Sequence, residues 1–368
     1  EMMLKQAEVM PPIPSVVPAM PYVPQSFIPN NKTVSEVLDE FMVYHKEQVH
    51  HATYEANVSN AKHIKRHLGD KQIATLKYSD VLDMINKVAK GNEKGPASKK
   101  TVENVRSFFS QVVKFARKEK WISAEDVDII TTGIKIPKVV KEYDSNEKFH
   151  EYDEIGRLLR ALKKNPRYYC IHKILLLTGM REQELFALNK KALKRDENYI
   201  QVSSAIKKQD TKKGHRAFEI GETKNKWSVR RVPAIPEVFF YFDELERYQI
   251  GSGGRAKSYI KGNGDLVVID RAGNAVNEHT FIENYKKYVD RNAPGAYYPL
   301  NDSRHCFRTH LEKLHAIDRN TQISMGHKLG GVSNTNYRGD NDAYMEELYP
   351  YIGEMAEKIN EATKNRKR

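Results

Sequence analysis

Cysteine is nearly absent from this chain of 368 residues, which holds only Cys170 and Cys306. Two cysteines cannot form a disulfide framework or a multi-cysteine zinc site, so both classes are excluded. No apolar run is long enough to span a bilayer. The stretch 10–18 is too rich in proline for the apolar core of a signal peptide. We therefore expect a cytoplasmic protein without a membrane partner.

Acidic residues are in the minority, with 48 Asp and Glu against 61 Lys and Arg, which gives a net charge of +13. Basic clusters lie at 62–66, 207–213 and 224–231. A broad basic surface is typical of a protein that binds a polyanion, most often nucleic acid. A basic protein that is merely soluble has the same composition, so charge alone leaves both interpretations open.

The length predicts two domains. Residues 1–31 carry seven prolines, which lack an amide hydrogen and fix φ, so we expect an extended N-terminal arm. This arm either packs on a surface or is a solvated tail. We assign residues 32–137 to a helical domain whose basic surface suits DNA, 138–149 to a linker and 150–368 to a second domain with a C-terminal helix.

Four helices are expected in the first domain. Thr33 and Glu36 form a capping box at the start of the first, the second covers about 51–68, and the others begin near Ser79 and Ser98. Charged residues lie opposite the apolar faces, which is typical either of solvated faces or of a surface that contacts the DNA backbone. The candidate DNA-binding residues here are Lys62, Lys65 and Arg66.

Helices at about 152–163 and 167–177 are expected in the second domain, and the Thr178-Gly179 pair ends the latter. Three β-rich runs follow at 199–202, 217–220 and 229–233, and their short connections predict an antiparallel meander. Residues 224–226 fall in the turn between the second and third runs. The stretch 279–365 is expected to be mostly helical.

Three segments supply residue types that attack a phosphodiester without a metal. They are Thr178-Gly179-Met180-Arg181-Glu182-Gln183-Glu184-Leu185, the stretch 300–311 with Arg304 and His305, and the stretch 325–337 with His327 and Tyr337. A phenol serves as the nucleophile, guanidinium groups grip phosphate oxygens as a bidentate fork, and imidazoles donate hydrogen bonds.

In order and spacing, these segments resemble the boxes of the tyrosine recombinases, the integrase family of phages and mobile elements. The resemblance covers about residues 32–365. It implies a mainly α fold with a small antiparallel β-sheet, in which a helical domain and an α+β catalytic domain form a clamp on DNA. It also implies site-specific recombination through a 3′-phosphotyrosine intermediate and a Holliday junction, with no cofactor and no metal.

The resemblance assigns a role to each site residue. Tyr337 would attack the phosphorus, while Arg181 and Arg304 would bind its two non-bridging oxygens. Glu184, on the same helix face as Arg181, would orient that guanidinium. Lys224 would protonate the leaving 5′ oxygen, with Lys226 as the alternative. Lys226 and Arg230 are further candidates for DNA contacts.

The histidines and Asn301 complete the expected site. His327 would hydrogen-bond a phosphate oxygen or the tyrosine, and His305 would support the fold or assist the base. Asn301 stands where the family usually has His or Lys. Its amide still donates a hydrogen bond, but it carries no charge and cannot shuttle a proton.

The expected partners are double-stranded DNA with a specific attachment site, a homotetramer of this chain on that DNA, and accessory DNA-bending proteins. The amphipathic stretch after Tyr337, with Met345 and Ile352, would dock on a neighbouring subunit; core packing within its own chain is the alternative. Two rival functions are a non-catalytic DNA-binding protein of the same fold and a relaxing enzyme of the type IB topoisomerase kind.

Overall fold

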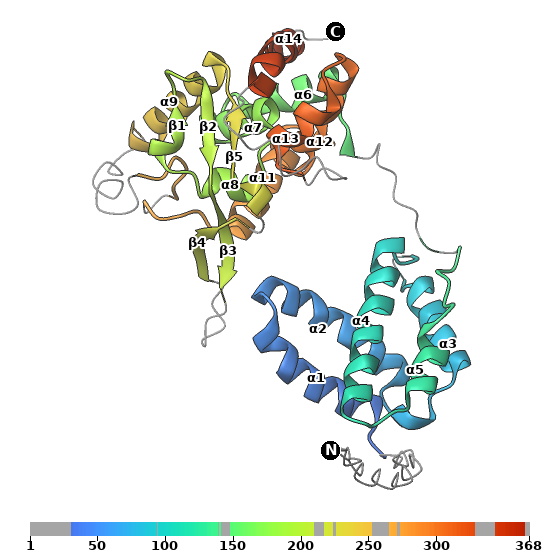
Figure 1. Cartoon of the computed structure of the whole chain (residues 1–368). Helices are drawn as coiled ribbons and strands as arrows, with labels where there is room; N and C mark the ends of the chain where they lie inside the picture. The colour runs from blue at the N-terminus through green and yellow to red at the C-terminus, as the bar shows by residue number, and fades with distance from the viewer. Residues whose placement is uncertain are drawn as a thin grey trace, which may run out of the picture. The chain divides into compact units, whose positions relative to one another are not determined.

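The structure is a computed structural model that describes residues 31–93, 95–138, 140, 148–209, 217–223, 226–251, 265–270, 273–327 and 343–364. The chain divides into two compact units, Glu1–Glu142 and Tyr143–Arg368 (Figure 1). This division falls inside the stretch that the sequence predicts as a linker. Of the expected N-terminal arm, residues 1–31, all but the last residue lie outside the described residues.

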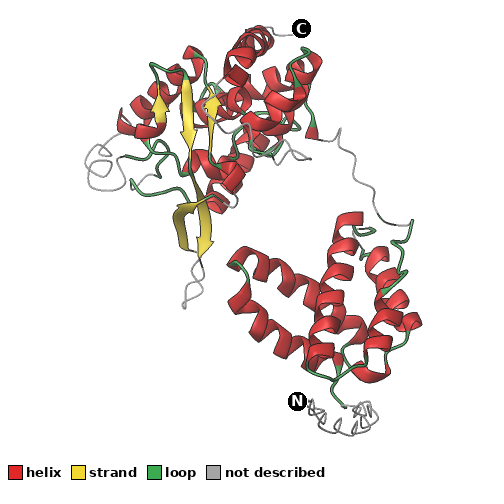
Figure 2. Ribbon diagram, viewed as in Figure 1, coloured by secondary structure: helices red, strands yellow, loops and turns green. Residues whose placement is uncertain are grey.

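The first unit is helical throughout its described elements (Figure 2). The predicted capping box is confirmed, because Glu36 N donates to the Thr33 side chain and Thr33 N donates to Glu36. Ser98 caps its helix as expected. The prediction of four helices missed one, a short helix that begins after the Ser123 cap. The helices are α1 (Val34–Gln48), α2 (His51–Leu68), α3 (Tyr78–Lys90), α4 (Lys99–Lys118) and α5 (Ala124–Thr131).

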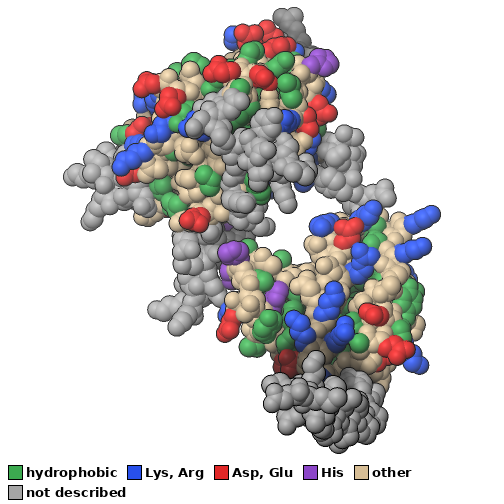
Figure 3. Space-filling model, viewed as in Figure 1, with side chains coloured by type: hydrophobic (Ala, Val, Ile, Leu, Met, Phe, Trp, Pro, Cys, Tyr) green, Lys and Arg blue, Asp and Glu red, His purple; other side chains and the backbone are tan. Residues whose placement is uncertain are grey.

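An apolar core holds the first unit together. Phe41 packs edge-on against Phe108, and both side chains are at most 5% exposed. On the visible face of this unit, lysine and arginine outnumber acidic side chains (Figure 3). The charges therefore lie outside and the apolar residues inside, as the helical periodicity predicts.

Helices also form most of the second unit. The buried helix α7 is apolar on nearly every side and ends at Gly179, which has a left-handed φ of 60°. A Cβ at that position would lie 2.4 Å from the Phe307 ring, so glycine is required there. The helices are α6 (Tyr152–Leu162), α7 (Pro166–Thr178), α8 (Glu182–Phe186), α9 (Pro236–Gly251), α11 (Glu278–Asn292), α12 (Asp302–Lys313), α13 (Asp318–Met325) and α14 (Ala343–Lys364).

The described residues of the second unit form two small antiparallel sheets (Figure 2). Strand β2 (Tyr199–Val202) lies between β1 (Leu193–Lys194) and β5 (Arg230–Pro233), while β3 (Ser204–Gln209) and β4 (Ala217–Glu222) form a separate hairpin. The predicted meander is therefore wrong. Its second run pairs with β3, a strand rich in polar residues that the apolar pattern did not reveal. Its third run returns beside β2, where buried Ile200 lies opposite buried Val232.

The helix α14 packs on its own chain, against α6, α12 and α13. Met345, Ile352 and Ile359 are at most 3% exposed. A Cβ on Gly156 of α6 would lie 2.3 Å from Ala362 O, so the two helices are in close contact. The prediction that this apolar face docks on a neighbouring subunit is wrong, since packing within the chain already buries it. No helix in the described ranges is both long enough and apolar enough to cross a membrane.

Candidate active site

The turn after α7 presents Arg181. This residue is the N-cap of α8, and its Nη1 donates to Glu184 Oε1 at 2.8 Å while its backbone N donates to Glu184 Oε2 at 3.0 Å. The Arg181 side chain is 36% exposed, whereas that of Glu184 is 2% exposed. The carboxylate thus fixes one edge of the guanidinium and leaves the rest accessible. This is the contact that the sequence spacing predicts.

Arg304 joins three segments that are far apart in the sequence. From buried α12, its Nη1 donates to Gly179 O at 2.7 Å and its Nη2 donates to Met325 O at 2.6 Å. These contacts place Arg304 beside the turn that carries Arg181 and beside the end of α13. Burial, together with the neighbouring charges of Arg181 and Arg230, lowers the pKa of Arg304 to about 9. It remains a cation at neutral pH.

His327 follows the end of α13 directly. Gly326 ends that helix in the left-handed region at φ 72°, and His327 N donates to Gln322 O at 3.0 Å. Burial and the positive charges of Arg304 and Arg181 lower the pKa of His327 to about 4. Its imidazole is therefore neutral at pH 7, with one nitrogen that donates and one that accepts. Two arginines and a histidine from separate segments converge here.

Arg230 does not lie where the sequence suggested. Its side chain is 5% exposed and forms a bidentate pair with Glu184, with Nη2–Oε2 at 2.9 Å and Nη1–Oε1 at 3.1 Å. It also donates from Nε to Ser324 O. Its prediction as a DNA contact is wrong, because these buried groups already occupy the guanidinium.

The Glu184 carboxylate is the acceptor that both arginines share. Burial acts to raise its pKa, but the charge of Arg230 and the hydrogen bonds from Arg230 and Arg181 outweigh burial and hold the pKa at about 2. Glu184 is therefore fully ionised at neutral pH. It offsets part of the positive charge gathered around the site.

Asn301 and His305 are half-buried on the helix of Arg304. Asn301 occupies the N-cap position of α12 without a capping hydrogen bond from its side chain. Burial and nearby Lys148 lower the pKa of His305. Within the described part of the chain, neither side chain makes a hydrogen bond. Their roles remain predictions.

Several predicted site residues are not brought into the described site. Tyr337 and Lys224 lie outside the described residues, and Lys226 begins a 3-10 turn, Lys226–Ser228, in which its side chain is not described. In the first unit, Lys62 and Arg66 are exposed on α2, whereas Lys65 pairs with Asp39 at 2.5 Å.

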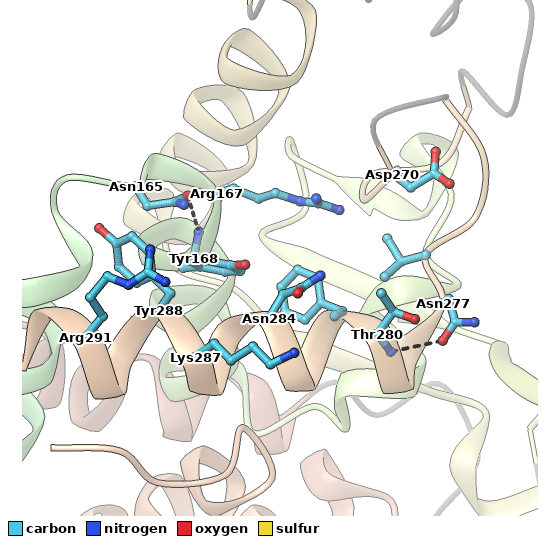
Figure 4. Close-up of a pocket in the computed structure, with 12 residues that line it drawn as sticks. Asn165, Arg167, Tyr168, Asp270, Asn277, Thr280, Asn284, Lys287, Tyr288 and Arg291 are labelled. Carbon is cyan, nitrogen blue, oxygen red and sulfur yellow. Dashed lines mark hydrogen bonds between the residues drawn. The ribbon is translucent and has the colours of Figure 1, made fainter. Parts of the chain in front are cut away.

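A polar pocket between α7 and α11 was not predicted from the sequence (Figure 4). It measures about 680 Å³, and Arg167, Lys287 and Arg291 line it with a single acid, Asp270. Periodicity in α11 could have revealed it, since Asn284, Lys287 and Arg291 recur at helical spacing and are exposed. Within the described ranges, no cluster of three or more His, Cys, Asp or Glu could hold a metal ion.

The sequence matches the phage integrase family over residues 148–343 and the SAM-like N-terminal domain of phage integrases over residues 33–89. A search among curated proteins gives no match.

Solved structures share the fold. One is the Tn1549 transposon integrase in complex with transposon right end DNA, with a TM-score of 0.62 and 21% identity over 81% of this chain and 92% of that one. Another is a lambda integrase tetramer bound to a Holliday junction, with a TM-score of 0.56 and 16% identity over 84% of this chain and 78% of that one. With the arginine boxes, the histidine turn and the family match, the chain belongs to the phage integrase family and is a site-specific DNA recombinase of the tyrosine type.

Proposed function

We propose that this recombinase cleaves DNA with Tyr337 while Arg181, Arg304 and His327 bind the phosphate. The convergence of these last three residues carries the proposal: Arg304 contacts both Gly179 O, two residues before Arg181, and Met325 O, two residues before His327. Tyr337 follows His327 by ten positions in the sequence. Attack by its phenolate on phosphorus forms a 3′-phosphotyrosine and releases a 5′ hydroxyl.

The two guanidiniums stabilise the charge that develops on the non-bridging oxygens. Such preorganised donors are typically worth about 3–4 kcal/mol each. His327 is neutral and donates a hydrogen bond to a phosphate oxygen or to the tyrosine. The phosphotyrosine link conserves the bond energy of the cleaved phosphodiester. The 5′ hydroxyl of a partner strand can therefore reverse the reaction.

Lys224 donates the proton that the leaving 5′ oxygen needs, and Lys226 is the alternative. A general acid of this kind contributes about 10²–10⁴-fold. The proposal is supported by the place of both residues in the sequence, directly before β5, whose Arg230 reaches into the site. Asn301 supplies a neutral hydrogen-bond donor on the helix of Arg304.

Phosphate contacts away from the reacting centre position the duplex. In the first unit we assign them to the exposed Lys62 and Arg66, and in the second to the cationic pocket of Figure 4. Lys287 and Arg291 make no ion pair with a described residue, so both charges are available to an anion. The salt dependence of binding should reflect these contacts.

The assembly that recombines two duplexes is a homotetramer on specific attachment sites, with accessory DNA-bending proteins. The similar lambda integrase forms a tetramer on a Holliday junction, which supports this part of the proposal. We place the protein on DNA in the bacterial cytoplasm.

The test is covalent capture of DNA on a nicked suicide duplex that carries the sequence flanking the coding gene. Wild type should yield a covalent protein–DNA complex in a denaturing gel, and Tyr337→Phe should yield none while still binding the duplex. Tyr349→Phe is the matched control, since its hydroxyl bonds Asn198 O at 2.8 Å in the second unit. Undiminished covalent product from Tyr337→Phe would show that another residue is the nucleophile.

A further inference from the structure

We propose that Arg230 is a positioning residue for strand cleavage. Through contacts with protein groups alone, it fixes the orientation of Arg181 and of the turn that leads to His327. This inference rests on the proposed function of that site. Arg230 lies at the start of β5, and its guanidinium meets α8 on one side and the end of α13 on the other.

The contact with α8 fixes Arg181 indirectly. Glu184 Oε1 accepts from Arg181 Nη1 and Arg230 Nη1, and Oε2 accepts from Arg181 N and Arg230 Nη2. Each carboxylate oxygen therefore accepts one hydrogen bond from Arg181 and one from Arg230. A carboxylate held by one arginine could still rotate. The second arginine therefore fixes the plane of the Glu184 carboxylate, and with it the orientation of the Arg181 guanidinium toward phosphate.

The contact with α13 fixes the histidine turn. Arg230 Nε donates to Ser324 O, and Arg304 Nη2 donates to the next carbonyl, Met325 O. Two cations therefore hold adjacent carbonyls at the helix C-terminus, where the helix dipole favours positive charge. A Cβ on Gly326 would lie 3.0 Å from Arg230 Cδ, so the arginine stem packs directly under the turn that leads to His327.

A direct role in phosphate binding is disfavoured by the same contacts. Arg230 Nη1 donates to Ser228 O at 3.0 Å in addition to Glu184, so its Nε and both Nη atoms already have protein acceptors. Arg304 is just as buried, but among the described residues only its two Nη atoms have protein acceptors, which leaves its Nε for a phosphate. The Arg181 side chain is 36% exposed. Arg181 is accessible to DNA, and Arg230 holds it in place through the shared Glu184 carboxylate.

The test measures single-turnover cleavage of the suicide duplex at saturating protein, alongside DNA affinity in a binding gel. Arg230→Gln should lower the cleavage rate constant about 100-fold and change affinity less than threefold, and Arg230→Lys should be intermediate. The control is Arg195→Gln, which removes a bidentate pair with Asp243 that is exposed instead of buried. It should leave the rate constant unchanged.

A pH profile separates positioning from folding. Glu184 faces Arg181 and Glu182 on α8, Arg230 on β5 and Arg304 on α12. Without Arg230, burial is opposed mainly by Arg181, so the acid limb of the cleavage rate should move to higher pH. Adding Glu184→Gln should abolish that move. The proposal would be overturned if both Arg230 variants gave less covalent complex but kept the wild-type rate constant and the wild-type acid limb. If wild type itself gave no covalent product, the proposed function would be contradicted instead.

Discussion

The two units bury different kinds of side chain. Among the described residues, His45 is the only polar or charged side chain buried in the first unit, whereas the second unit buries charged residues that include Lys173, Glu184, Arg230 and Arg304. An apolar core follows from helical patterning alone, but a buried charge is costly unless it is paired. The difference indicates that the first unit is a scaffold with a basic surface, whereas the second unit adds paired buried charges to its apolar core.

The largest effect is expected at Arg304, and it tests whether this buried cation of the second unit contributes to strand cleavage. Arg304→Lys removes the fork that spans Gly179 O and Met325 O. We expect the cleavage rate constant to fall about 10²–10³-fold, because a lysine cannot give the same two donors. Single-turnover cleavage at saturating protein measures it.

The matched control lies in the first unit. Arg106 Nη1 also donates to a backbone carbonyl, Ile134 O at 2.7 Å. Arg106→Gln should lower the stability of the first unit and leave the cleavage rate constant unchanged. Equal losses of rate in the two variants would contradict the division of labour between the units.

A second expectation concerns acid. Burial lowers the pKa of His172 to about 3 and that of His310 to about 4, and both side chains are fully buried in the second unit. Because the folded pKa lies below the unfolded value of about 6.5, each contributes stability above pH 6.5 that is lost as pH falls toward 4. The loss is on the order of 3 kcal/mol per histidine.

The two units should therefore respond differently to acid. Thermal unfolding of the full chain between pH 7 and pH 4, followed by hydrogen exchange, should show the second unit losing protection first. His310→Asn should weaken that pH dependence. Earlier loss in the first unit would contradict this comparison.

The smallest effect is expected at the surface of the first unit. Lys62→Gln should weaken binding to all duplexes alike and reduce the slope of log K against log salt by about 0.9. Lys65→Gln should change the slope less, since Lys65 is paired with Asp39. Binding gels at several salt concentrations measure both slopes, and equal slopes for the two variants would show that the Asp39 pair does not matter.

Sequence patterns predicted the first unit better than the second. The capping box at Thr33, the helix start at Ser98 and the apolar periodicity of α1, α3 and α4 are local signals, and the structure agrees with them. The family boxes also pointed to Arg181, Arg304 and His327, and the structure brings these three residues together. Their catalytic roles stay predictions. The local predictions succeeded because each depends on a short stretch of residues.

The errors concern contacts between distant segments. Arg230 reads as an exposed basic residue in a basic cluster, and only tertiary structure shows that Glu184 and Ser324 enclose it. Strand β3 is polar and pairs with β4, so the predicted meander of the three apolar runs does not form. The apolar face of α14 fits its own chain or a neighbour equally well by pattern, and packing on α6 decides for its own chain.

Mass spectrometry of the trapped covalent complex tests the central claim most directly, namely that the arginines and the histidine of the second unit present a phosphate to a tyrosine near its C-terminal end. After digestion with trypsin and nuclease, the account predicts a nucleotide attached to the peptide that contains Tyr337. A nucleotide on the peptide of Tyr344 or Tyr349, or on a residue of the first unit, would contradict it.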